Sequence, residues 1–165
     1  MKQNTRSRQK IRFLCQGAII AALYVVLTFV ARLLGLDSGV IQLRFSEALC
    51  LLPILFPPAI VGVTLGCFLA NLLSGAVILD VIFGPIATLI GALGTYLLRR
   101  HKYLATLPPI LSNAIIIPFV LAYGYGASDS IPFMMLTVGL GEFISIFLLG
   151  LALIPILKKR IKYHL

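Results

Sequence analysis

The chain has 165 residues, of which 60% are hydrophobic, and its net charge is +9 because 14 lysines and arginines face only 5 carboxylates. Soluble globular domains of this size are far less apolar, so the composition excludes that class and predicts an integral membrane protein. An α-helix needs about 20 apolar residues to cross a bilayer, so several spans leave no room for a catalytic module. We therefore expect a single transmembrane domain over residues 1–165.

The positive charges form three clusters, and their placement argues against nucleic acid as a partner. A basic head covers residues 1–12, a central cluster lies within residues 99–102, and a basic tail covers residues 158–165. Basic clusters beside apolar spans are typical of the cytoplasmic face of a membrane. Both termini and the central cluster are therefore predicted to be cytoplasmic, with the lipid bilayer surrounding a multi-pass protein.

Six apolar segments follow one another and predict an all-α integral membrane protein, a bundle of six transmembrane helices. The expected spans are residues 13–35, 46–57, 59–74, 80–98, 104–123 and 132–157. The second and third spans are separated by Pro57 and Pro58, because proline breaks a helix. An even number of spans is needed to bring the basic head and the basic tail to one side.

Small side chains mark faces where we expect helices to approach closely. Ala18 and Ala22 lie one turn apart in the first span, on a narrow face that suits either internal packing or the docking of another helix. Gly62, Gly66 and Ala70 repeat every four residues in the third span. The fourth span carries three glycines and two threonines, and this composition predicts a thin helix at the centre of the bundle.

Two sets of polar residues are the candidates for function, because a charged side chain at the bilayer centre costs on the order of 3 kcal/mol and normally faces a partner or a cavity. Glu142 in the sixth span and Asn113 in the fifth are both deep enough to meet near the middle of the membrane. The second set is expected in the outer third of the membrane and contains Arg44, Glu47, Asn71 and Asp80. Such a set would suit a flat polar ligand.

Each set also has a structural interpretation. A hydrogen bond between Asn113 and Glu142 would fasten two helices, and an ion pair from Arg44 to Glu47 or Asp80 would pin a loop. Enzyme motifs are missing from the sequence: it has no H-E-x-x-H and no phosphate-binding loop, and both histidines lie in basic segments. The cysteines, which are expected to be free and buried, have no metal-ligand spacing. No catalytic residue, metal or cofactor is therefore predicted, which leaves binding or transport.

Three motifs carry a resemblance to a known family. Gln42-x-Arg44-Phe45-Ser46-Glu47-Ala48-Leu49-x-x-Leu52-Pro53 is followed by Gly66-x-x-x-Ala70-Asn71 and by Asp80-x-x-x-Gly84-x-x-x-Thr88-Leu89. Together they resemble the QueT family of queuosine-precursor transporters, which are substrate-binding (S) components of energy-coupling factor (ECF) transporters. The first span also matches the Ala-x-x-x-Ala of S components.

The resemblance implies a protein of the bacterial plasma membrane that captures a deazaguanine base from outside. It would act with an ECF transmembrane coupling subunit, which would dock on Ala18 and Ala22, and with two ATPase subunits. Carboxylates accept a guanine-like edge in bidentate fashion. The implied ligand-binding residues are Glu47, Asp80 and Glu142 for that edge, Asn71 and Asn113 for the remaining ring edge, Phe45 or a tyrosine for stacking, and Arg44.

Two readings from other classes stay open. One is a proton- or cation-coupled secondary transporter that works alone, with Glu142 as the proton carrier. The other is a structural membrane protein without a small ligand, in which the outer polar residues only fasten the bundle.

Overall fold

The computed structural model describes residues 2–37 and 41–162, and the side chains of residues 7–37 and 41–159. Met1, residues 38–40 of the predicted outer loop and residues 163–165 of the predicted tail lie outside the described residues. The elements are α1 (Lys2–Leu33), the 3₁₀ helix η1 (Phe45–Ile54), α2 (Ala59–Leu73), α3 (Ile78–Leu97), the short 3₁₀ turn η2 (Leu104–Thr106), α4 (Leu107–Gly124), α5 (Ile131–Glu142), the π-helical segment η3 (Phe143–Gly150) and α6 (Leu151–Lys162).

The all-α prediction is confirmed over the described residues. By length and composition, four helical stretches there suffice to cross a bilayer, namely Ser7–Leu33, Ile78–Leu97, Leu104–Gly124 and Ile131–Lys159. Phe45–Ile54 and Ala59–Leu73 are apolar but shorter, and each rises only about 20 Å against a hydrocarbon core of about 30 Å. The six-span count therefore stays a prediction for these two segments.

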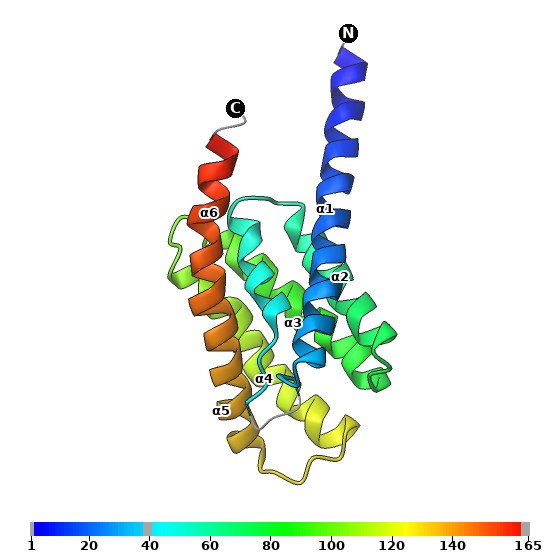
Figure 1. The fold of residues 1–165 in the computed structure, drawn as a ribbon, viewed down its shortest axis with the longest axis vertical. Coiled ribbons are helices and arrows are strands. Elements are labelled where there is room, and N and C mark those ends of the chain that lie inside the picture. Colours follow the sequence, from blue (N-terminus) through cyan, green and yellow to red (C-terminus); the bar gives the residue numbers. More distant parts are fainter. Residues whose placement is uncertain (1, 38–40, 163–165) are drawn as a thin grey trace.

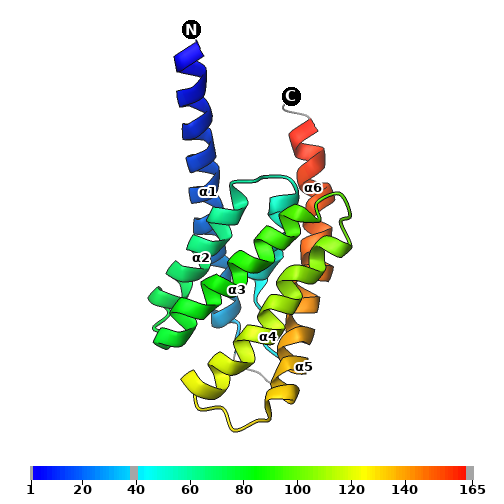
Figure 2. The same ribbon diagram turned by 180° about the vertical axis from the view of Figure 1, so that it is seen from behind.

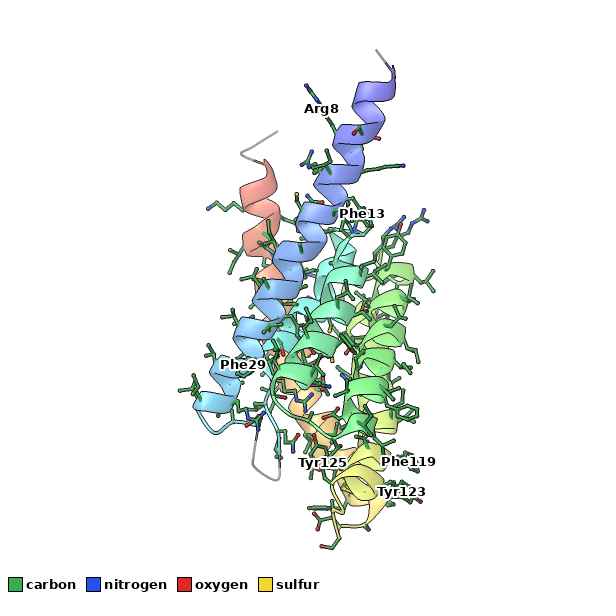
Figure 3. The ribbon with its side chains drawn as sticks, turned by 90° about the vertical axis from the view of Figure 1, so that its right-hand side faces the viewer. Arg8, Phe13, Phe29, Phe119, Tyr123 and Tyr125 are labelled. Atoms are coloured by element: carbon green, nitrogen blue, oxygen red, sulfur yellow. The ribbon has the colours of Figure 1, made fainter. Side chains whose placement is uncertain are left out.

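The basic clusters gather at one end of the bundle. Both described chain ends lie there, and α1 extends beyond the other helices (Figure 1). The connection between α3 and α4, which carries Arg99, Arg100 and Lys102, lies at the same end (Figure 2). Tyr123 and Tyr125 mark the opposite end (Figure 3). This arrangement fits the charge pattern, and the assignment of the basic end to the cytoplasm stays a prediction.

The buried centre of the bundle is η1, which packs against α1, α2, α3 and η3. Ser46 to Pro53 are all buried, which keeps the carboxylate of Glu47 out of contact with lipid. The prediction that the fourth span is central is wrong. One face of α3 is exposed, with Phe83 and Ile86 on it, and its small residues serve contacts with neighbouring helices. A Cβ at Gly91 would lie 2.5 Å from the Cα of Pro109 on α4.

The small residues of α2 bring it close to α1, as the glycine stripe predicts. A Cβ at Gly66 would lie 2.6 Å from the Tyr24 Cβ, so the two helices touch there without an intervening side chain. Ala18 and Ala22 lie elsewhere on α1 and are exposed. Cys15 is also exposed, as are its neighbours Ile11 to Leu14, which corrects the expectation that all three cysteines are buried.

Candidate functional site

A cavity of about 400 Å³ lies at the end of the bundle opposite the chain termini, and we call it the vestibule. Its wall is built from α1, the loop that follows α1, the end of α2, the turn between α2 and α3, the start of α3, and the end of α4. Arg32, Gly75 and Tyr125 in this wall are exposed, so the vestibule opens at the surface. Its other polar lining residues are Thr28, Asp37, Gln42, Arg44, Asn71, Ser74 and Asp80.

A second cavity, of about 20 Å³, lies among η1, α2, α3, α4 and α5, and we call it the inner cavity. A volume of this size holds about one water molecule. It is lined by Glu47, Cys67, Gly84, Thr88, Asn113, Val138 and Glu142, together with Gln42, Arg44 and Ile117, which also line the vestibule. These last three residues therefore stand between the two cavities.

Glu47 is held by hydrogen bonds from three elements. The Tyr24 hydroxyl on α1 donates to Oε1, and the Cys50 thiol on η1 donates to Oε2 over 3.2 Å. Asn113 on α4 places its Nδ2 donor 3.5 Å from Oε2. The 3₁₀ repeat of three residues brings Cys50 above Glu47. Because Glu47 is only 2% exposed, these donors offset the cost of burying its polar oxygens.

Glu142 ends α5 at the point where the helix widens into η3, and it lines the inner cavity with Glu47 and Asn113. Its Oε2 atom is buried, and among the described residues no donor bonds it. The Ser145 hydroxyl, one turn further along, is also buried without a partner in this part of the chain. Buried polar atoms are normally satisfied, so Glu142 offers a free acceptor beside the cavity.

Asp80 fastens three elements in the wall of the vestibule. The Asn71 amide on α2 donates to its Oδ1 over 3.2 Å and to its main-chain carbonyl over 2.9 Å. The Tyr125 hydroxyl after α4 donates to its Oδ2 over 3.0 Å. Burial and the Asp80 carboxylate both raise the pKa of Tyr125, so this donor stays protonated at neutral pH.

Arg44 precedes η1 and its half-buried side chain lines both cavities. In the part of the chain that the structure describes, the guanidinium makes no hydrogen bond or close ion pair; the ion pair found there joins Arg32 Nε and Asp37 Oδ2, 4.0 Å apart. The alternative in which Arg44 pins the loop through Glu47 or Asp80 is therefore not realised. Burial lowers the pKa of Arg44, but the surrounding acidic groups, of which Asp80 has the largest effect, together raise it by more, so the side chain stays charged.

The loop that carries Gln42 meets α5 directly. A Cβ at Gly141 would lie only 2.1 Å from the Gln42 carbonyl oxygen, so the two backbones touch and only glycine fits. The contact sits beside Glu142 and fixes Gln42 between the cavities.

The structure groups the predicted residues differently from the sequence. Glu47 lies with Asn113 and Glu142 at the inner cavity, while Asn71 and Asp80 line the vestibule. Arg44 belongs to both. Phe45 lies next to Arg44, half-buried, and is not among the lining residues of either cavity.

Four further residues of the site were missed. Tyr24 gave a signal as the one side chain with a hydroxyl in the apolar run from Ala18 to Leu27, and Gln42 belongs to the first motif. Thr88 was counted as a small residue and belongs to the third motif, but it was not named as a site residue. Tyr125 lies in a predicted loop, and the residues around it in the sequence give no sign that it bonds Asp80.

Comparison with known proteins identifies the family. The QueT transporter family matches residues 14–159. The chain is similar to the queuosine precursor transporter QueT of Lactococcus lactis subsp. cremoris (strain MG1363), with 35% identity over 155 residues that cover 87% of this chain and 90% of the relative. No solved structure gives a significant match. With its apolar helices, the chain is a multi-pass protein of the bacterial cell membrane, and it belongs to the QueT transporter family.

Proposed function

We propose that the chain is the substrate-binding component of an ECF-type uptake transporter and that its ligand is a queuosine precursor, a deazaguanine base. The ligand enters through the vestibule and binds at the inner cavity. The observation that carries the proposal is the pair of buried carboxylates, Glu47 and Glu142, beside one cavity next to an open vestibule. The name of the Lactococcus relative supports the ligand class.

The chemistry of the inner cavity suits a guanine-like edge. Such an edge carries N–H donors, and the free Oε2 of Glu142 accepts them without breaking an existing bond. Glu47 is pre-oriented by Tyr24 and adds a second acceptor. Asn113 would hydrogen-bond the remaining polar edge of the ring. The cavity of about 20 Å³ is too small for a bicyclic base, so it must widen when the ligand binds.

The other predicted residues take supporting roles. Asn71 and Asp80 are already bonded to each other, so they shape the entrance and meet the ligand as it passes. Phe45 stacks on the base after its half-buried side chain turns toward the cavity. Arg44 borders both cavities.

Coupling to ATP hydrolysis is assigned to partner chains, since this sequence has no phosphate-binding loop. The exposed face of Ala18 and Ala22 is the docking site for the transmembrane coupling subunit, because small residues let two helices approach closely. Two ATPase subunits complete the transporter.

A binding titration tests the ligand site. Purified protein is titrated with 7-deazaguanine, and Glu142→Gln and Glu47→Gln are each expected to weaken binding about 10- to 100-fold, the value of a charge-assisted hydrogen bond. Asp129→Asn, which neutralises an exposed loop carboxylate, is the matched control and is expected to bind as the unaltered chain does. If neither glutamate variant weakens binding, the site proposal is wrong.

Liposomes that contain only this chain separate the transport classes. An S component binds its ligand without accumulating it, so no uptake is expected until the coupling subunit and ATPases are added. Accumulation driven by a proton gradient, and abolished by Glu142→Gln, would instead identify a stand-alone secondary transporter. Failure of every deazaguanine to bind would favour a structural role.

A further inference from the structure

We infer that Arg44, together with Gln42 and Ile117, closes the passage between the vestibule and the inner cavity, and that the Arg44 side chain must swing away to admit a ligand. The identity of that ligand rests on the function proposed above, whereas the closed passage rests on geometry alone.

These three residues lie where the two cavities meet. Of all the residues that line the two cavities, Gln42, Arg44 and Ile117 are the three common to both. The vestibule measures about 400 Å³ and the inner cavity about 20 Å³. A molecule that moves from the wide space to the buried carboxylates must therefore pass between these side chains.

The three residues differ in how tightly their surroundings hold them. Ile117 is 7% exposed and sits on α4, where its packing holds it. Gln42 is fixed through its backbone by the contact with Gly141. Arg44 has a long, half-buried side chain, and among the described residues nothing bonds its guanidinium. It is the least constrained of the three.

Asp80 is the destination of the guanidinium when it swings outward. Asp80 in the vestibule accepts one side-chain hydrogen bond at each carboxylate oxygen, from Asn71 and from Tyr125. A carboxylate offers about four acceptor positions, so Asp80 has room for Arg44. An outward swing of Arg44 toward Asp80 would open the passage and keep the positive charge compensated.

A thiol reporter tests the passage without any ligand. Cys67 lines the inner cavity and is 2% exposed. Replacing the other two cysteines, Cys15→Ser and Cys50→Ser, leaves Cys67 as the single thiol, and a serine at position 50 keeps a donor for Glu47. The probe is iodoacetamide, which is small, polar and uncharged, and the measured quantity is the rate at which Cys67 is alkylated in lipid nanodiscs.

Arg44→Ala is expected to raise this alkylation rate by about tenfold or more, because access no longer waits for the side chain to swing. Electrostatics alone would act in the opposite direction, since loss of a nearby positive charge disfavours the reactive thiolate. Arg32→Ala is the matched control: Arg32 lines the vestibule but not the inner cavity, and the rate is expected to stay unchanged.

Two results would overturn the inference. One is an alkylation rate in Arg44→Ala no higher than in the parent. The other is an equal increase in Arg32→Ala, which would indicate general loosening. If Arg44→Ala does not give a monodisperse protein, Ile117→Ala opens the same passage from α4, and an unchanged rate in that variant would refute the closure.

Binding kinetics with 7-deazaguanine add a second readout. Arg44→Ala is expected to raise both the association and the dissociation rate constants. Equal rate constants in the variant and the parent would contradict Arg44 as the moving part. If 7-deazaguanine does not bind the unaltered chain, the proposed function fails, while the alkylation of Cys67 still decides whether the passage is closed.

Discussion

Tyr24 on α1 and Glu47 on η1 are joined by a hydrogen bond in which the phenolic hydroxyl donates to Oε1 of the carboxylate, and both side chains are 2% exposed. The bond ties the long first helix to the buried centre of the bundle. It also orients the carboxylate that borders the inner cavity, so one contact serves stability and site geometry together.

Tyr24→Phe removes this donor and leaves a buried carboxylate oxygen without it. Hydrogen bonds between membrane helices contribute about 0.6 kcal/mol on average and up to about 1.7 kcal/mol. A bond to a buried carboxylate belongs at the upper end of this range, so we expect the free energy of unfolding to fall by about 1–2 kcal/mol. The free energy of unfolding in detergent micelles is the measurement. Tyr123→Phe, at a side chain that is 75% exposed, is the control and is expected to have no effect.

Gly66→Ala tests the contact between α1 and α2. The added methyl would lie 2.6 Å from the Tyr24 Cβ and 3.0 Å from the Ala21 carbonyl oxygen, so the helices must separate. Overpacking of this kind costs about 1–3 kcal/mol. Gly139→Ala is the matched control, because its nearest neighbour, the Ala114 Cβ, lies at an ordinary 3.5 Å. Equal thermal stability of the two variants would refute the close contact.

Tyr125→Phe tests the fastener at the vestibule. The pKa of Tyr125 is raised in the folded protein, so the bond to Asp80 stabilises the fold below the unfolded-state pKa, about 10, and is lost as pH rises through the folded-state value. The melting temperature of the variant is therefore expected to lie below that of the parent by a constant margin from about pH 6 to pH 9, and the margin should narrow at higher pH. In an Asp80→Asn background the same substitution should cost less, and an undiminished cost would speak against the bond.

Ala18→Leu combined with Ala22→Leu tests the proposed docking face. Both alanines are exposed, so the double variant is expected to keep its stability and its affinity for 7-deazaguanine. Uptake into liposomes that also hold the coupling subunit and ATPases should fall about tenfold or more, because the added side chains prevent close helix contact. Val30→Leu, at an exposed position two turns beyond Ala22 on the same helix, is the control and should transport normally. Normal uptake by the double variant would rule out this face.

The sequence predicted the helical segments well, because apolar runs and prolines mark their ends directly. The predicted third span, residues 59–74, matches α2 (Ala59–Leu73) to within one residue. What the sequence left open is the identity of the central element. Glycine content favoured α3, but an apolar surface can face lipid as well as protein, so apolarity does not decide which element is central. Burial of η1 is instead favoured by Glu47, whose carboxylate would be costly in contact with lipid.

The sequence predicted which residues line the candidate site better than it predicted which of them lie together. Arg44, Glu47, Asn113 and Glu142 were all singled out, since charged and amide side chains in apolar segments are few. Depth along a helix placed Glu47 with Asp80, whereas the structure places it with Asn113, 66 residues away. The depth of a residue along its helix gives its position along the membrane normal. Its position in the plane of the membrane depends on helix packing, which sequence periodicity alone does not determine.

The contact between Gly141 and the Gln42 carbonyl has a consequence for how the family can vary. Any side chain at position 141 would push the Gln42 loop away from α5. The size of the opening can therefore change through a residue that lines neither cavity. Under the proposed function, a change of one carbon behind the loop would therefore alter the path of the ligand without changing any residue that lines it.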